Sequence, residues 1–528
     1  MDKSKLKKFA TSLRVELITT ISSKVDFLLS LDIENLPVAY REYKNHIDTI
    51  RSKTSVTQQK EEFIEEIAYT WFNRFVALRF MDANEITQTS VVTPLQDGGT
   101  PAIFTLAKEG DIDDELNLNK ELFFDLIDGN INSNDPENEA YRMLFVSVCN
   151  YYSNIMPFMF ESIKDYTELL LPDDMLSANS IRAKVVEAMD DDSCQDIEVI
   201  GWLYQFYISE KKDEVFAKLK KNQKITPNNI PASTQLFTPH WIVKYMVENS
   251  LGKLWMLNNP HSTLKEHMRY YIEDTSSDDD FLKIQTPQEL TLLDPCCGSG
   301  HILTYAFDLL TLIYEEQGYS KSQIPTLILQ HNLYGCDIDK RASTLANFAL
   351  TMKARLYHRR FFRNSVKTNI IELQEYNDFV GIKNFGSLLK PIKEQDEEDG
   401  LLGISSEHYN KQKEILSSTF SCVVTNPPYM GSKGMNKELS DFVKKHYPYS
   451  KSDLFAVFME RGLEFTKEQG YMAMINQHSW MFLSSYEKLR VKIIKNHKID
   501  SLVHLGARAF EEIGGEVVQS VAFVLQKG

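Results

Sequence analysis

Asp294-Pro295-Cys296-Cys297-Gly298-Ser299-Gly300 is the stretch that decides the fold. It follows a short apolar run, Leu290–Asp294, that is typical of a buried strand. It precedes His301–Glu316, in which apolar residues recur at helical spacing. A glycine-rich turn between a strand and a helix lets backbone N–H groups approach an anionic ligand. Because many nucleotide-binding folds have such a turn, the stretch predicts a doubly wound α/β sheet but no particular ligand.

The chain from residue 231 to residue 528 alternates strand-like runs with helical runs. This alternation predicts a mainly parallel sheet with helices on both faces. Strands are expected at Leu290–Asp294, Asn332–Asp337, Phe420–Thr425, Tyr471–Asn476, Ile499–Leu505 and Val517–Leu525, and helices at His301–Glu316, Lys340–Tyr357 and Tyr486–Asn496.

Residues 1–230 are expected to form a separate, mostly helical N-terminal domain. Glu61–Met81 and Ile197–Lys220 place apolar residues at helical spacing. Val91–Asn138 contains several glycine, proline, asparagine and aspartate breakers and is expected to be an irregular insertion.

Composition limits the compartment and the partners. No run approaches the ~18 apolar residues that a membrane span requires. The six cysteines show no C-x-x-C pair, so reduced thiols in a cytoplasm are expected. The net charge of -16 argues against a general nucleic-acid binder, so a DNA enzyme would need a local basic surface. Two basic clusters are candidates: Lys353, Arg355, Arg359, Arg360, Arg363 and Lys367, and Lys433, Lys437, Lys444 and Lys445.

Gly335-Cys336-Asp337-Ile338-Asp339 ends the second expected strand. An acidic residue at this place in a doubly wound sheet hydrogen-bonds ribose hydroxyls. Asp337 is the better candidate because Asp339 can instead cap the next helix, and capping is the alternative for either residue. In the glycine turn, backbone donors suit a carboxylate and Asp294 can accept from an amine.

Asn426-Pro427-Pro428-Tyr429, directly after an expected strand, is the most specific motif of the chain. The exocyclic amine of a nucleobase is a poor nucleophile because its lone pair is delocalised into the ring. The Asn426 side-chain oxygen and the Pro427 carbonyl can accept its two hydrogens, with the prolines fixing their direction. Tyr429 offers a face for stacking on an extruded base. A plain turn is the alternative.

Thr234-Gln235-Leu236-Phe237-Thr238-Pro239 lies upstream of the glycine turn. One interpretation places Phe237, Thr238 and Pro239 as a lid on a bound ligand. In the other, Thr238 caps the helix His240–Asn249 and Pro239 occupies its first turn.

The order of these motifs resembles the gamma class of amino methyltransferases. More narrowly, the chain resembles the PglX methyltransferases of BREX phage-defence systems in Ile200–Tyr207, Leu292–Ile302, Asn426–Lys437 and Ser452–Phe455. The resemblance covers nearly the whole chain, but PglX proteins are roughly twice as long. The C-terminal target-recognition region of that family is therefore expected to be missing.

The resemblance implies a Rossmann-like methyltransferase sheet, mostly parallel with an antiparallel last strand. It implies S-adenosylmethionine as methyl donor, adenine N6 of double-stranded DNA as acceptor, and a role in BREX phage defence. Other BREX proteins and a phage inhibitor protein are further expected partners. Direct methyl transfer is expected, without a catalytic metal and without a nucleophilic Cys296 or Cys422.

The resemblance also implies the residues of the site. The catalytic residues are expected to be Asn426, Pro427, Pro428 and Tyr429. Cofactor contacts are expected from Phe237, Thr238, Pro239, Asp294, Pro295, Cys296, Gly298, Gly300, Asp337, Ile338, Phe385 and Asn426. One departure is that Asn384–Leu388, the nearest match to the region after the third strand, lacks the acidic residue that often contacts the cofactor adenine. Phe385 is expected to stack on the adenine instead.

Three other functions stay open. Asp196, Glu210 and Lys212 match a loose pattern of metal-dependent nucleases, as in a restriction–modification enzyme. That chemistry needs these residues on a strand edge, whereas Ile197–Lys220 has helical spacing. A scaffold that binds DNA or partner proteins without turnover is the second alternative. Methylation of RNA or protein is the third, because related motifs occur in enzymes that act on glutamine and RNA bases.

Overall fold

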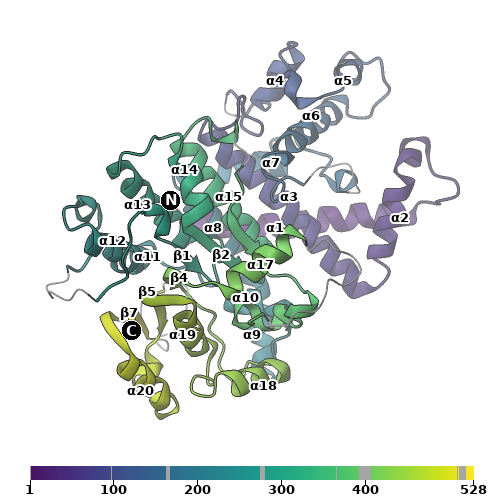
Figure 1. Ribbon diagram of the computed structural model, residues 1–528. Coiled ribbons are helices and arrows are strands. Elements are labelled where there is room, and N and C mark those ends of the chain that lie inside the picture. Colours follow the sequence, from purple (N-terminus) through teal and green to yellow (C-terminus); the bar gives the residue numbers. More distant parts are fainter. Residues whose placement is uncertain are drawn as a thin grey trace, which may run out of the picture. The chain divides into compact units, whose positions relative to one another are not determined.

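The computed structural model describes residues 2–96, 98–161, 167–273, 280–363, 366–391, 406–507, 509–510 and 519–528. The chain divides into two compact units, Met1–Tyr207 and Ile208–Gly528 (Figure 1). The boundary expected at residue 230 falls inside the second unit. Val215, Ile225 and Ile230 are part of the hydrophobic core of that unit.

The first unit is helical, and its described residues contain no strand. Its α-helices are α1 (Lys3–Ser30), α2 (Lys44–Lys53), α3 (Thr57–Ala83), α4 (Ala102–Lys108), α5 (Lys120–Ile127), α6 (Pro136–Ser153), α7 (Ile181–Ala188) and α8 (Glu198–Tyr207). Helix α3 is buried on all sides from Tyr69 to Asp82, except at Thr70, so it forms the centre of the unit. Among the described residues of the chain, none of the helices combines the length and apolarity that crossing a membrane demands.

A buried carboxylate holds the irregular segment after α3. Asp82 Oδ1 accepts hydrogen bonds from Thr87 Oγ1 at 2.8 Å and from Val91 N at 2.9 Å. Its Oδ2 accepts from Val92 N at 2.8 Å and from Thr93 N at 3.0 Å. Burial raises the pKa of Asp82, and the four donors act in the opposite direction. Both oxygens of the carboxylate therefore accept hydrogen bonds that hold the conformation of residues 87–93.

The second unit is built on one seven-stranded sheet with the order β3-β2-β1-β4-β5-β7-β6. Strands β1 to β5 run parallel, and β7 is antiparallel to both β5 and β6. The strands are β1 (Leu292–Asp294), β2 (Leu333–Asp337), β3 (Asn369–Glu372), β4 (Phe420–Thr425), β5 (Thr466–Gln477), β6 (His497–Gly506) and β7 (Ser520–Lys527). The mostly parallel sheet with an antiparallel last strand is confirmed.

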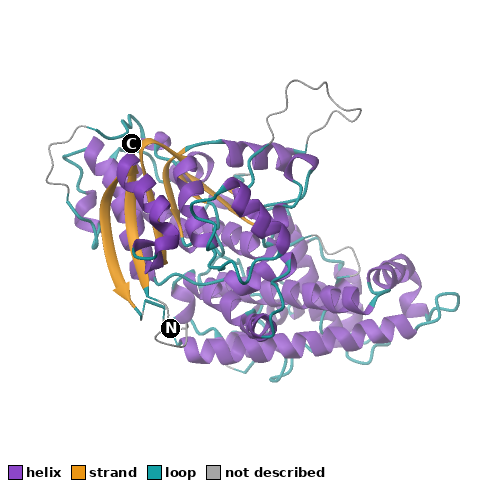
Figure 2. Ribbon diagram, turned by 90° about the horizontal axis from the view of Figure 1, so that it is seen from below, coloured by secondary structure: helices purple, strands orange, loops and turns teal. Residues whose placement is uncertain are grey.

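Helices cover both faces of this sheet (Figure 2). Alternate residues of β1 divide between two cores: Leu292 packs with α11, α13 and α15, and Leu293 packs with α17, α19 and α20. The α-helices of the unit are α9 (Ser209–Lys220), α10 (Ile230–Thr234), α11 (His240–Val247), α12 (Lys253–Asn258), α13 (His301–Glu316), α14 (Ile324–Leu327), α15 (Lys340–Tyr357), α16 (Ile382–Phe385), α17 (Glu407–Ser417), α18 (Lys437–His446), α19 (Leu454–Phe465) and α20 (Glu487–Asn496).

The sequence patterns missed one strand. β3 pairs with β2 through four residues and ends at Glu372. Its sequence, Asn-Ile-Ile-Glu, contains only two apolar residues, which is too few to show a period.

Candidate active site

The glycine turn joins β1 to α13 at the carboxyl end of the sheet. Gly298 and Gly300 have φ angles of +52° and +83°, which side chains other than hydrogen disfavour. A Cβ on Gly300 would lie 3.0 Å from both Cα and Cβ of Ala346, so glycine allows α13 to approach α15 closely. The turn is also tied to β2, because Cys297 N donates to Cys336 O at 3.1 Å.

Two carboxylates lie beneath this turn, Asp294 buried and Asp337 half-buried. Asp294 accepts from Cys296 N at 3.1 Å, and Asp337 accepts from Gly298 N at 3.0 Å and from Asp339 N at 2.9 Å. Burial, with a smaller contribution from Asp337, raises the pKa of Asp294 to about 7. Burial, with a smaller contribution from Asp339, raises the pKa of Asp337 to about 6. Asp339 instead accepts from Arg341 N at 3.0 Å at the start of α15, so the capping interpretation of Asp339 is confirmed.

The Asn426 amide at the end of β4 has a fixed orientation. Its Nδ2 donates to the Leu236 carbonyl oxygen at 3.2 Å and to Thr238 Oγ1 at 3.1 Å. Both contacts are with acceptors, so the opposite side of the amide presents Oδ1. The capping interpretation of Thr238 is wrong. Pro239 occupies the N-cap of α11 without a side-chain hydrogen bond, and the Thr238 hydroxyl is directed to Asn426.

The Tyr429 hydroxyl lies beside this amide. It is 2.9 Å from Asn426 Oδ1 and 2.7 Å from the Ile475 carbonyl oxygen on β5. A phenol has one proton, so it can donate to only one of these oxygens at a time. Burial, reinforced by Asp453, raises the pKa of Tyr429 well above its ordinary value, so the proton stays on the hydroxyl.

The segment around Phe385 closes another side of the site. The Phe385 ring stacks on Phe442 with centroids 4.4 Å apart. Ser387 Oγ donates to Pro295 O at 2.7 Å, and the buried Arg461 donates through Nε to Ser387 O at 3.0 Å. The third strand ends in an acidic residue, Glu372, but Glu372 forms a 2.6 Å ion pair with Lys383 and does not line the cleft described next.

A cleft with about 960 Å³ of empty space, open solvent at its mouth included, lies between these segments. Its wall combines apolar side chains with a few polar ones, as the walls of ligand-binding clefts do. The predicted residues on its wall are Phe237, Thr238, Asp294, Pro295, Cys296, Gly298, Asp337, Ile338, Phe385, Asn426 and Pro428. Pro239, Gly300, Pro427 and Tyr429 belong to the adjoining turns but do not form the wall.

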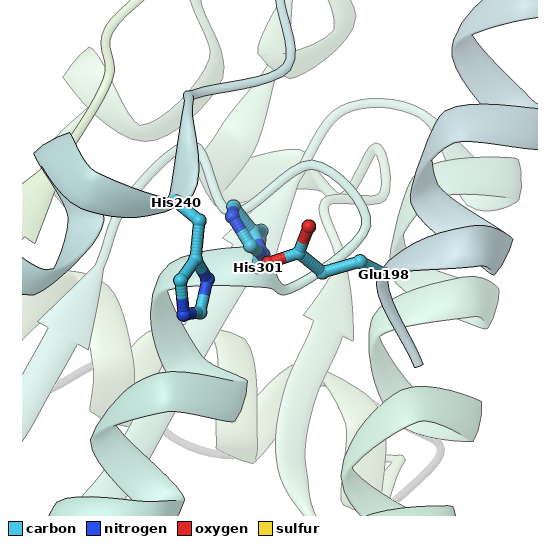
Figure 3. Close-up of side chains that lie close together, drawn as sticks. All are labelled: Glu198, His240 and His301. Carbon is cyan, nitrogen blue, oxygen red and sulfur yellow. The ribbon is translucent and has the colours of Figure 1, made fainter. Parts of the chain in front are cut away.

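Several wall residues were not expected from the sequence. They are Ile230, Pro231, Thr234, Gln235, Leu236, Ser299, His301, Ile302, Leu373, Asn384, Gly386, Ser387, Leu388, Leu439, Leu454 and Phe458. Cys297, beside Cys296 in the glycine turn, also lines the wall. His301 was the most accessible to prediction, because it follows the glycine turn directly. Its ring stacks on Phe237 with centroids 4.4 Å apart, and the His240 ring lies 5.5 Å from it (Figure 3).

The cysteines near the site are poor nucleophiles. All six are free thiols. Burial is the main cause that raises the pKa of Cys296, Cys297 and Cys422, and a raised pKa removes the reactive thiolate at neutral pH. The arrangement favours hydrogen-bond chemistry at Asn426 over covalent chemistry at sulfur.

Comparison with known proteins gives this site a family context. Residues 331–510 match the family of Eco57I restriction-modification methylases. Adenine-specific methyltransferase BrxX of Escherichia coli O9:H4 (strain HS) is 36% identical over 100% of this chain and 50% of its own length. Adenine-specific methyltransferase PglX of Lacticaseibacillus casei (strain Zhang) is also 36% identical, over 100% of this chain and 51% of its own length.

The chain is PglX-like. The PglX-like chain spans about half the length of the curated relatives it matches. Its matched methylase region includes β2, β3 and β4, and it therefore contains both Asp337 and the motif Asn426–Tyr429. A solved structure described as a DrdV–DNA complex covers 99% of the PglX-like chain with 12% identity and a TM-score of 0.47.

Proposed function

We propose that this PglX-like chain transfers a methyl group from S-adenosylmethionine to N6 of adenine in double-stranded DNA, as part of BREX-type phage defence. The observation that carries the proposal is the fixed amide of Asn426. Its two Nδ2 contacts, to Leu236 and Thr238, direct Oδ1 away from them at the wall of the cleft. The adenine-specific methyltransferase names of the two whole-length relatives support the same activity.

The cleft fits the proposed cofactor. Asp337 lines it with a half-buried carboxylate, which can accept from ribose hydroxyls while it keeps its bonds to Gly298 and Asp339. Beneath the turn at Gly298, Asp294 offers an acceptor to the amine of the cofactor. Phe385 offers an aromatic wall for a purine. When bound, S-adenosylmethionine supplies an electrophilic methyl group.

The protein acts on the acceptor by orienting its amine. Asn426 Oδ1 and the Pro427 carbonyl accept hydrogens of the adenine N6 amine and localise its lone pair. Pro427 and Pro428 restrict the backbone, so these acceptors need little reorganisation. When the amine arrives, the Tyr429 hydroxyl can donate its hydrogen bond to the Ile475 carbonyl oxygen instead of Asn426 Oδ1, because the carbonyl oxygen is already 2.7 Å away.

The nuclease alternative gains no support. Glu210 and Lys212 lie on helix α9 instead of a strand edge, and Lys212 Nζ donates to Gln235 O at 2.6 Å. The shared metal site of such nucleases requires acids and lysine along one strand.

The test is methylation by the unaltered chain and by Asn426→Ala. Each is incubated with S-adenosylmethionine and duplex DNA of mixed sequence, and N6-methyladenine is measured by mass spectrometry. We expect Asn426→Ala to lose at least about 1,000-fold in rate, because an acceptor preorganised for the transition state is removed. Calorimetric titration with S-adenosylmethionine should show that both proteins bind the cofactor.

Asn410→Ala is the matched control, since Asn410 is exposed on α17, and it should methylate like the unaltered chain. Methylation that survives in Asn426→Ala would overturn the role of the amide. An unaltered chain that binds cofactor but methylates only RNA would overturn the substrate.

A further inference from the structure

Eight exposed lysines from two distant parts of the sequence form one surface of the second unit. Four of them end α9 and follow it, and four lie in the loop after Tyr429 and in α18. They are Lys218, Lys220, Lys221, Lys224, Lys433, Lys437, Lys444 and Lys445, here called the lysine surface. Only the second group was apparent as a basic cluster after the catalytic motif.

Direct contacts join the two segments. Lys224 Nζ donates to the Lys433 carbonyl oxygen at 2.5 Å. Ile225 N donates to Gly434 O at 3.1 Å, and Asn436 Nδ2 donates to Ile225 O at 3.3 Å. Figure 1 shows α9 and α18 as neighbours on the same side of the unit. The lysines are therefore held together by the fold and not only by their order in the chain.

The charge of this surface is not neutralised within the described chain. None of the eight lysines makes an ion pair with a described acidic residue. The acids on the same helices are Glu210, Asp213, Glu214, Glu438 and Asp441, which are fewer than the eight lysines, so the local balance is positive in a chain whose net charge is -16. Adjacent like charges repel, and an external anion would relieve that repulsion.

The lysine surface borders the cleft. Its two segments present lysines outward, while Ile230, shortly after the first segment, and Leu439, within α18, line the wall of the cleft. A nucleotide whose base enters the cleft remains joined to phosphates on either side. Those phosphates must pass over the rim beside the cleft.

We propose that the lysine surface binds the phosphate backbone of the double-stranded DNA that flanks the target adenine. This inference rests on the proposed function and specifies where its substrate lies. Lysine is a flexible point charge that binds phosphate without the bidentate geometry by which arginine recognises guanine. The surface therefore positions DNA of any sequence and does not read its bases.

The experiment measures binding of a fluorescent duplex of arbitrary sequence by anisotropy at several salt concentrations. The variants are Lys220→Gln with Lys221→Gln, Lys444→Gln with Lys445→Gln, and all four together. Lys495→Gln with Lys498→Gln is the matched control, since both lysines are exposed on α20 and β6 and lie outside the lysine surface.

Each of the first two pairs should weaken binding on the order of tenfold and reduce the slope of log affinity against log salt by about 1 to 2. The fourfold variant should show both losses, and the control pair should bind like the unaltered chain. Cofactor affinity should be the same in all variants, which separates this surface from the cleft.

Equal losses in the control pair, or no loss in the fourfold variant, would overturn the lysine surface and leave the methyltransferase proposal standing. Preferential binding of single-stranded RNA would overturn DNA as its partner. Failure of the unaltered chain to bind duplex DNA would overturn the surface, whereas failure to bind S-adenosylmethionine would overturn the proposed function.

Discussion

Asp82 in the first unit is buried and Asp337 in the second is half-buried, and in both the partial or full loss of solvent raises the pKa. Asp82 accepts four hydrogen bonds, all from the segment between Thr87 and Thr93. From the described part of the chain Asp337 accepts two, from Gly298 and Asp339, and its remaining side faces a cleft. A buried carboxylate whose acceptors are all used by its own chain maintains the fold. One that keeps acceptors toward a cavity is available to a ligand.

The largest expected effect is the loss of Asp82. Asp82→Ala leaves four donors without their acceptor, three of them backbone N–H groups. The free energy of unfolding should fall by at least about 3 kcal/mol. Urea unfolding followed by circular dichroism measures the change. Asp111→Ala, at an exposed aspartate of the same unit, should stay within about 0.5 kcal/mol of the unaltered chain. If Asp82→Ala lowered the free energy of unfolding by less than about 1 kcal/mol, Asp82 would not be a carboxylate that maintains the fold.

Asp337→Asn tests the other side. The amide keeps the size of the side chain but loses the charged oxygen that would accept a hydrogen bond from a ribose hydroxyl. Affinity for S-adenosylmethionine should therefore fall roughly 10- to 100-fold. The free energy of unfolding should change by less than about 1 kcal/mol, because the cost of burying the charge disappears together with a hydrogen bond. Calorimetric titration and urea unfolding measure the two quantities.

Asp339→Asn is the matched control, since asparagine also caps helices and Asp339 is absent from the wall of the cleft. If Asp339→Asn lowered cofactor affinity as much as Asp337→Asn, a general effect of charge would replace the specific role of Asp337.

Thr238→Val tests a neutral hydrogen-bond acceptor, the Thr238 hydroxyl, beside the two aspartates compared above. It removes one of the two hydrogen bonds that orient Asn426, so kcat should fall about tenfold while the KM for cofactor changes little. Thr238→Ser retains the hydroxyl and should restore kcat. A purely structural role would instead lower stability in both variants and leave no difference between kcat and KM.

The smallest expected effect is on pH dependence. In the free protein the pKa is about 7 for Asp294 and about 6 for Asp337, both above their unfolded values. Their contribution to stability is therefore present below about pH 4 and is lost as the pH rises through 6 to 7. A cationic cofactor favours the ionised carboxylates, so its binding should release protons.

Affinity for S-adenosylmethionine should accordingly rise by up to about tenfold between pH 5.5 and pH 7.5. Titrations in buffers of different ionisation enthalpy measure the proton release. Asp337→Asn should show a weaker pH dependence, and an unchanged dependence would assign the protons to other groups.

Local patterns predicted the regular elements where the pattern is long. His301–Glu316 and Lys340–Tyr357 are helices with the expected bounds, and Phe420–Thr425 is a strand with the expected bounds. The four residues of β3 were missed because their strand conformation depends on pairing with β2 and not on their own pattern.

The candidate site divides in the same way. Asp294, Asp337 and Asn426 belong to contiguous motifs, so the sequence could indicate them, and their roles stay predictions. Thr238 was assigned either to a lid or to a helix cap, because its partner Asn426 lies on a distant strand. The contact of Lys224 with Lys433 could not be predicted either, because no pattern in one segment indicates that it packs against the other.

The order of the strands also bears on how such a protein can change its specificity. The two carboxylates assigned to the cofactor, Asp294 and Asp337, end β1 and β2, and the motif assigned to the acceptor, Asn426–Tyr429, follows β4. The two halves of the sheet meet in one short seam, where Leu292 and Leu293 of β1 pair with Cys422 and Val423 of β4. Evolution or design can therefore remodel the half that selects the recipient of the methyl group while inheriting the donor half intact.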